Sequence, residues 1–198
     1  MKKRRGPMTA GDLMAELEAD PEFVVQRKGR DRVFAERAAQ HRIEEKPFLI
    51  ELRKVLPNVQ SVWDLVNTSD KYVQAIPFLV EHLQCPYPDR VRGGIARALA
   101  VREASDAWPI LVAEYGKTSI EKEQSWTKDG LAVALSVTAT DAVMEELVEI
   151  VKDRSHGGSR VLLLSALKKS KSPLAKQALE ELASDPELSK EIASWRRR

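Results

Sequence analysis

The sequence predicts an all-α protein that is built largely from a repeated pair of helices. Three observations predict it: apolar residues recur at helical spacing, two leucine series share one period, and strand-like alternation is absent. One helix pair cannot bury its apolar stripe alone, whereas a stack of pairs makes one continuous core. We therefore expect an α-α superhelix (solenoid) of three to four helix pairs with an N-terminal helical extension.

The chain is expected to divide into four segments. These are a basic flexible tail (1–8), the N-terminal helical extension (9–60), the solenoid (61–195) and a second basic tail (196–198). Because a residue that precedes proline avoids the helical backbone conformation, we expect a break or bend before Pro47. Residues 23–43 are expected to lie against the outside of the solenoid or to project partly from it.

Capping residues indicate where several helices begin. A Ser or Asp followed by proline is typical of a helix start. The Ser or Asp side chain accepts a backbone N–H of the first turn, and proline lacks the N–H that would have no partner at that position. Two further starts resemble capping boxes in which Asp replaces the usual Glu. The proline starts are Asp20-Pro21, Ser172-Pro173 and Asp185-Pro186, and the boxes are Thr9 with Asp12 and Ser61 with Asp64.

Two interleaved series of helices account for the chain after residue 70. The first helix of each pair aligns on a leucine at steps of 32, 36 and 32 residues: Leu79, Leu111, Leu147 and Leu179. The second helix aligns at steps of 36 and 32 residues on Leu99, Leu135 and Leu167. Two series with one period indicate a unit of two helices. We expect residues 61–70 to cover one end of the stack, and Leu188, Ile192 and Trp195 to cover the other.

The unit at residues 76–99 resembles a HEAT repeat. It has Pro77 in the first helix, Asp89 in the turn, and Val91-Arg92 opening a second helix that ends in Ala98-Leu99. The resemblance covers about residues 71–183 and implies that second helices line a concave face, with Asp and Arg forming a ladder along the turns. The whole chain also resembles uncharacterised bacterial HEAT-repeat proteins, which share a lead-in of the form of residues 12–23. This second resemblance does not point to any particular activity.

The ladder is only half preserved in this sequence. Its basic position recurs at Arg92, Lys128 and Arg160, at steps that match the leucine period. Its acidic position does not recur, because Ser125 and Gly157 stand where the first unit has Asp89. The second and third units are therefore degenerate relatives of the first.

The charge of the chain between its two tails argues against nucleic-acid binding by that part of the protein. The net charge is +2, but seven basic residues lie in the two terminal tails, and residues 6–195 alone sum to −5. Proteins that neutralise phosphates normally have a basic body. The tails would give only a weak, salt-sensitive attraction to polyanions.

Several other classes of protein are disfavoured. The longest run without a charged residue is 11 residues, Gly130 to Thr140, well short of the ~20 that span a bilayer. The single cysteine, Cys85, cannot form an internal disulfide, and the three histidines have no partner at metal-ligand spacing. Gly93-Gly94 lacks the lysine and strand of a phosphate loop and is interpreted as a site of close helix packing. We expect a cytoplasmic protein without a membrane partner, metal or cofactor.

We expect a non-enzymatic protein-binding module, an adaptor or regulator that uses the second helices. Solenoids offer an extended surface and seldom the enclosed pocket that catalysis requires. Second helices are the more basic series, so the expected partner is a protein with an acidic surface. The candidate binding residues are Arg92, Arg97, Lys128, Arg160 and Lys168. The alternative is that these charges form solvated faces that pair between helices.

A second interpretation is nucleic-acid binding, with or without base excision. The chain resembles, in Trp126, Asp129, Arg160 and Trp195, the DNA glycosylases for alkylated purines that are built on HEAT-like repeats. The resemblance implies that Asp129 stabilises positive charge developing on the sugar, that the tryptophans contact the lesion, and that Arg160 holds a phosphate. A core tryptophan beside a helix-start aspartate is the commoner meaning of such a pair. A third interpretation is a structural domain of a larger assembly, which would self-associate.

Overall fold

A computed structural model describes residues 8–118 and 125–195 of the chain. The expected basic tails therefore lie outside the described residues, apart from Met8. Within those residues the fold contains α-helices and short 3₁₀ helices and no strand, which confirms the all-α prediction. The chain forms two compact units, Met1–Ile43 and Glu44–Arg198, and each is described by itself.

The helices follow one another along the chain with short connections. The α-helices are α1 (Ala10–Glu18), α2 (Pro21–Val55), α3 (Val62–Val66), α4 (Ile76–Leu83), α5 (Asp89–Ala98), α6 (Trp108–Lys117), α7 (Trp126–Thr138), α8 (Met144–Lys152), α9 (Arg160–Lys169), α10 (Pro173–Leu182) and α11 (Ser189–Trp195). The 3₁₀ helices are η1 (Val73–Ala75), η2 (Arg102–Ala107), η3 (Asp141–Val143) and η4 (Arg154–Ser159).

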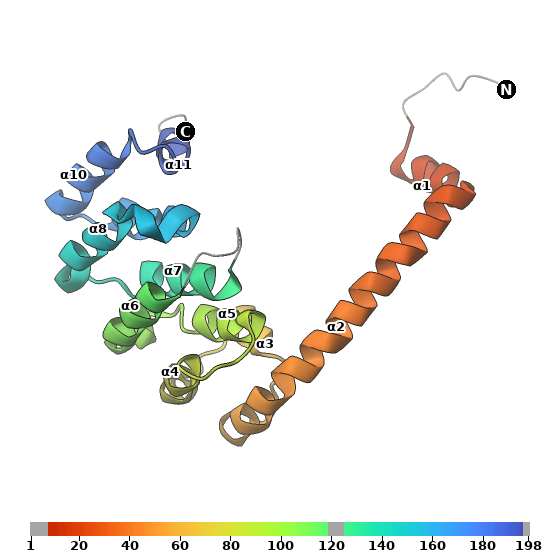
Figure 1. Ribbon diagram of the computed structural model, residues 1–198, viewed down its shortest axis with the longest axis horizontal. Helices are drawn as coiled ribbons and strands as arrows, with labels where there is room; N and C mark the ends of the chain where they lie inside the picture. The colour runs from red at the N-terminus through yellow and green to blue at the C-terminus, as the bar shows by residue number, and fades with distance from the viewer. Residues whose placement is uncertain (1–7, 119–124, 196–198) are drawn as a thin grey trace. The chain divides into compact units, whose positions relative to one another are not determined.

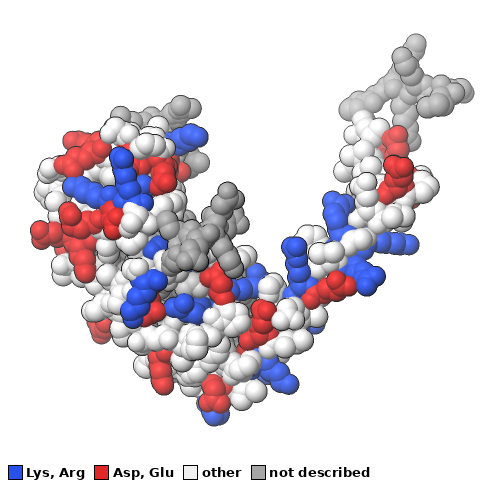
Figure 2. All heavy atoms as spheres, viewed as in Figure 1, with Lys and Arg blue, Asp and Glu red and all other residues white. Residues whose placement is uncertain are grey.

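The first unit consists of α1 and the N-terminal part of α2. The predicted capping box begins α1, where the Thr9 hydroxyl accepts the backbone N–H of Asp12 at 3.2 Å. Apolar side chains of this part of α2 are exposed, Val25 by 70% and Phe34 by 65%. Both signs of charge alternate along its surface (Figure 2). Its helicity therefore depends on capping and local charge pairs more than on a core.

The helix α2 runs through Pro47, so of the break or bend predicted before that residue, the break is wrong. Proline has no N–H for the carbonyl four residues earlier, and this loss normally ends or kinks a helix. Here the turns after Pro47 carry Phe48, Leu49 and Leu52, all of which are buried in the core of the second unit. Their packing holds the helix together at this point, and it places residues 44–55 in the second unit rather than in the extension.

The second unit contains helix pairs at the predicted period. The second helices pack on one another, α5 on α7 and α7 on α9. The short helix α3 packs on α5 in the same row, and we count it with the second helices. Each of α4, α6 and α8 packs on the second helix that follows it, and α10 packs on α8 and α9. Figure 1 shows α3, α5 and α7 along one side of this unit and α4, α6, α8 and α10 along the other.

The aligned leucines form the centre of this core. Leu79, Leu111, Leu147, Leu99, Leu135 and Leu167 are at most 1% exposed, whereas Leu179 is half-buried. Leu188 and Ile192 are also buried, in agreement with their expected place at the C-terminal end. The leucine period therefore identified the buried stripe of both helix series.

Local capping signals were mostly sufficient to locate helix starts. Ser61 and Asp64 form the predicted capping box of α3, and the Ser172 hydroxyl caps α10. The start expected at Pro186 lies instead at Ser189. The carboxylate of Asp185 accepts the N–H groups of Glu187 and Leu188, so the residues between form a turn before α11 begins.

Glycines let the second helices approach closely. A β-carbon on Gly93 would lie 2.5 Å from the carbonyl carbon and oxygen of Trp126 in α7. One on Gly130 would lie 2.6 Å from the carbonyl oxygen of Gly93 in α5. Because these contacts are with backbone, no side chain can move aside to relieve them. The expectation that Gly93-Gly94 permits close packing is confirmed.

Across the described ranges no helix combines the length and apolar character needed to cross a membrane. The same residues contain no group of three histidine, cysteine or acidic side chains that could hold a metal ion.

Candidate functional site

The recurring basic residues are buried or half-buried, and they cap the first helix of their own pair. The last carbonyls of a helix have no partner within the helix, and positive charge is favourable there. Each basic side chain donates to one carbonyl in a last turn: Arg92 Nε to Leu83 at 3.2 Å, Lys128 Nζ to Tyr115 at 2.5 Å, and Arg160 Nη1 to Val151 at 3.1 Å. The basic half of the ladder therefore has a structural role.

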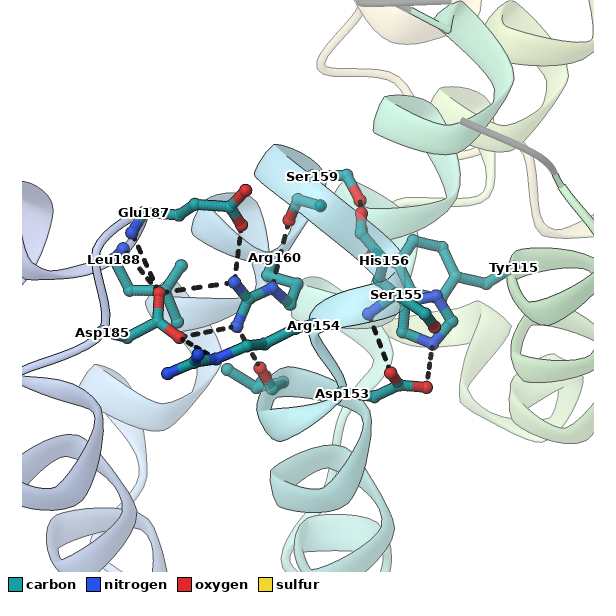
Figure 3. Close-up of polar contacts among 12 residues, drawn as sticks. Tyr115, Asp153, Arg154, Ser155, His156, Ser159, Arg160, Asp185, Glu187 and Leu188 are labelled. Atoms are coloured by element: carbon teal, nitrogen blue, oxygen red, sulfur yellow. Dashed lines mark hydrogen bonds and ion pairs between the residues drawn. The ribbon is translucent and has the colours of Figure 1, made fainter. Parts of the chain in front are cut away.

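Arg160 is also at the centre of a buried ion-pair network (Figure 3). Its side chain is 1% exposed, and its guanidinium contacts both oxygens of Asp185, at 3.2 and 3.3 Å, and Oε2 of Glu187 at 2.5 Å. Burial opposes ionisation of Asp185, but its hydrogen bonds from Arg160 and backbone N–H groups hold its pKa below the ordinary value. Arg160 is therefore not accessible to a partner protein or to a phosphate.

The other two members of the basic series are likewise engaged internally. Arg92 forms an ion pair with Glu114, Nη2 to Oε2, at 2.9 Å, and Glu114 is itself buried. Lys128 is 2% exposed; its ammonium lies 3.0 Å from Nδ1 of His156 and 3.9 Å from the centre of the Tyr115 ring. Burial lowers the pKa of Lys128 to about 8. Both side chains therefore have internal partners, although that of Arg92 remains 23% exposed.

Two of the five predicted binding residues, Arg97 and Lys168, lie on one exposed face of the second helices. We call this surface the second-helix face; its partly exposed members recur at helical spacing along α3, α5, α7 and α9. They are Trp63, Val66, Arg90, Arg97, Trp126, Asp129, Val133, Leu162, Ser165 and Lys168. The Oγ atoms of Ser165 and Ser136 lie 3.2 Å apart, which joins the α7 and α9 parts of this face.

A tryptophan–arginine cluster, made of Trp63, Arg90 and Trp126, stands at the start of three adjacent second helices. The guanidinium carbon of Arg90 lies 5.1 Å from the centre of the Trp63 ring and 4.8 Å from that of Trp126. The two indoles meet edge to face with centroids 5.6 Å apart, and Trp126 remains 45% exposed. This geometry suits cation–π attraction and leaves a large aromatic surface in contact with solvent.

The geometry of the cluster depends on Asp89. Its carboxylate accepts the hydroxyl of Ser125 at 3.0 Å and the backbone N–H groups of Trp126 and Thr127 at 2.9 and 3.0 Å. Although burial opposes it, these hydrogen bonds lower the pKa of Asp89 below the ordinary value. Asp89 thereby fixes the first turn of α7, and with it the position of Trp126.

The candidate pair of the glycosylase interpretation, Trp126 and Asp129, also lies on the second-helix face. Burial raises the pKa of Asp129, the positive charge of Arg97 opposes that shift, and Asp89 reinforces it. The remaining members of that interpretation are not brought to the pair: Arg160 is buried, and Trp195 stacks under the ammonium of Lys168 at 4.3 Å. The second-helix face therefore presents Trp126 and Asp129, but not Arg160, the arginine that was expected to hold a phosphate.

Sequence reasoning missed Trp63 and Arg90 as site residues. A usable signal was present, because Trp63, Arg90 and Trp126 each occupy the first or second position of a second helix. Equivalent positions of stacked helices fall side by side, so large side chains there must meet. The leucine register, extended to the helix starts, aligns Arg90 with Trp126, 36 residues apart, whereas Trp63 lies 27 residues before Arg90 and outside that period.

The second-helix face can bind a ligand by aromatic stacking, apolar contact and charge, since Arg90, Arg97 and Lys168 lie beside exposed indole and aliphatic surface. Comparison with known proteins found no family model, no curated protein and no solved structure that matches this chain.

Proposed function

We propose that this protein is a non-enzymatic binding module whose helix pairs stack as a short HEAT-like α-solenoid, and that it binds a partner protein with an acidic surface through the second-helix face. The tryptophan–arginine cluster carries the proposal. Tryptophan and arginine dominate the residues whose truncation costs most at protein interfaces. Here Arg90 is held between two indoles, and Trp126 is 45% exposed.

The charges of the face support an acidic partner. Of the predicted binding residues, Arg97 and Lys168 stay on this surface, and Arg90 joins them from the cluster. Figure 2 shows acidic side chains over α8 and α10, the first-helix side of the second unit, with basic side chains among them. A partner with exposed carboxylates would be attracted to the second helices and repelled by the first.

Quantitative affinity capture from cell extract, with nuclease treatment, tests this function. Two variants alter the cluster, Trp126→Ala and Arg90→Gln. Two matched controls alter exposed side chains of the first helices. They are Leu174→Ala on α10 and Lys117→Gln on α6; the Lys117 side chain is 71% exposed. We expect a discrete protein that survives nuclease, is retained by both controls, and is lost about tenfold or more with either cluster variant.

Equal recovery of the same proteins by all five forms would overturn the proposed face. Recovery of nucleic acid, with associated proteins lost after nuclease, would overturn the proposed partner class. Raising salt separates the two further, since affinity for a polyanion falls steeply with salt concentration, whereas an interface anchored by a desolvated indole tolerates moderate salt.

A second candidate function is excision of alkylated purines from DNA, favoured by the shared exposed face of Trp126 and Asp129. A carboxylate there would stabilise positive charge on the sugar as the base departs. Incubation with duplex DNA that contains 7-methylguanine tests it: release of the base by the intact chain, and its loss in Asp129→Asn, would support this function. No release from either form would leave the binding module as the function.

A further inference from the structure

A second site lies on the same side of the second unit, at the other end of the second helices. An open groove of about 460 Å³ is bounded by the end of α3, the residues that follow it, η1, and the last turns of α5 and α7. This volume is within the range of small-molecule sites, ~300–1,000 Å³. Its walls are mostly aliphatic, and they include Val66, Ile76, Val101, Val133 and Val137.

Arg97 supplies the charge of this groove. Its Nε is buried, and among the described residues it is the one buried side-chain nitrogen or oxygen without a hydrogen-bond partner. The neighbouring acid Glu103 pairs instead with Lys71, Oε1 to Nζ, at 3.2 Å, and no ion pair within 4.0 Å joins Arg97 to a described carboxylate. An unpaired guanidinium N–H is costly, and Arg97 lines the groove, so a bound acceptor that reaches its guanidinium would be favoured.

Several other polar groups of the groove already have partners, although Ser69 and Asp70 also line it. The hydroxyl of Tyr72 donates to the carbonyl of Ala98 at 2.8 Å, and Lys71 is held by Glu103. A peptide segment would bring backbone N–H and C=O groups that find few partners on aliphatic walls, and each unpaired group would weaken binding. A ligand that is apolar except for one carboxylate fits this lining better.

We propose that the groove binds a free aliphatic monocarboxylate of medium chain length. The carboxylate accepts hydrogen bonds from the guanidinium of Arg97, and the alkyl chain lies against Val133, Val137 and Ile76. Charge-assisted hydrogen bonds from arginine to a carboxylate are among the stronger ones in proteins. The groove shares Val66, Arg97 and Val133 with the second-helix face, but the tryptophan–arginine cluster contributes no residue to it, so variants of the cluster separate the two proposals.

Titration calorimetry of the full chain with octanoate tests the site. We expect affinity to rise about fourfold for each CH₂ added from butanoate to octanoate, since each buried CH₂ contributes a constant increment. Octanol, which matches the chain but lacks the charge, should bind roughly tenfold or more weakly. Methyl signals of Val133 and Val137 in NMR spectra should shift with octanoate and not with acetate.

Two arginine variants make the test specific. Arg97→Gln should remove the preference for octanoate over octanol, while Arg90→Gln should leave octanoate affinity unchanged. The second variant also separates this proposal from the partner-binding function, which it is expected to impair. If Arg97→Gln fails to fold, the chain-length series and the octanol comparison on the unaltered protein still decide the matter.

Three outcomes would overturn the proposal. They are equal affinities for octanoate and octanol, no binding of octanoate at millimolar concentration, and binding of an acetylated dipeptide that ends in a free leucine carboxylate when octanoate does not bind. The last would assign the groove to a peptide terminus instead.

Discussion

Two arginines bind the same carboxylate, and their burial decides what each contributes. Nη1 of Arg160 and Nε of Arg154 lie 3.2 and 3.3 Å from Oδ2 of Asp185. The Arg160 side chain is 1% exposed, whereas that of Arg154 is 72% exposed. Removing one partner of a buried pair strands a buried charge, whereas an exposed pair contributes little.

We therefore predict different costs for the two substitutions. Arg160→Met should lower the free energy of unfolding by about 3–5 kcal/mol, because Asp185 is left buried without its main partner. Arg154→Met should change it by less than about 1 kcal/mol. Urea denaturation followed by circular dichroism measures both, and equal losses would contradict the assignment of Arg160 as the central cation.

His156 gives the second unit a predictable response to acid. Burial, the Lys128 ammonium at 3.0 Å and the nearby Arg160 lower the pKa of His156 below 6.5, while Asp153 opposes the shift. With a lowered folded-state pKa, the unfolded chain binds the proton first, so stability falls as pH drops through 6.5. Protonation would also remove the acceptor that Nδ1 offers to Lys128.

The corresponding prediction concerns the slope of stability against pH. The melting temperature of the unaltered protein should fall between pH 7 and pH 5, and His156→Gln should make that fall shallower. Thermal unfolding in buffers of matched ionic strength measures it. An identical slope in the variant would show that other groups, and not His156, set the acid response.

At the scale of elements, small residues decide how closely α5 and α7 approach. We predict that Gly93→Ala destabilises the protein by about 1–3 kcal/mol, because the new methyl group meets the backbone of Trp126. This loss occurs although alanine favours a helix by about 1 kcal/mol over glycine. Gly116→Ala in α6 is the control, since a β-carbon there meets nothing within 4 Å; it should be neutral or stabilising by up to about 1 kcal/mol.

Guanidinium denaturation curves of the two alanine variants measure these effects. A stabilised Gly93→Ala would mean that the helices separate without cost and that glycine is not required at this contact. The same contact positions Trp126. If the Gly93→Ala variant no longer bound the partner protein, that would be independent evidence that the start of α7 had moved.

At the scale of the whole molecule, the core lies in the second unit. Its buried apolar residues begin at Phe48 and continue to Ile192, and no apolar residue of the described range 8–43 is buried. We predict that residues 44–198 fold without residues 1–43 and unfold in one cooperative transition, within about 5 °C of the full chain. Differential scanning calorimetry measures this. A loss of the cooperative transition would place part of the stability in the first unit.

The sequence by itself determined the helical class, the two-helix period and the buried leucines, because each depends on local spacing. Apolar residues at i, i+3 and i+4 share one helix face wherever the helix lies, and a Ser or Asp cap acts on its own first turn. The repeat of Arg92, Lys128 and Arg160 was also visible. Its role was not, because a cation on an exposed face and a cation that caps a neighbouring helix have the same sequence.

The tertiary structure decided which charges are buried and which side chains meet. Pro47 stays within α2 because Phe48 and Leu52 pack in a core that local rules do not contain. Trp63, Arg90 and Trp126 come together only because glycines allow three second helices to approach closely. Burial and contact depend on residues distant in sequence, so the binding face could be read only after the helices were placed against one another.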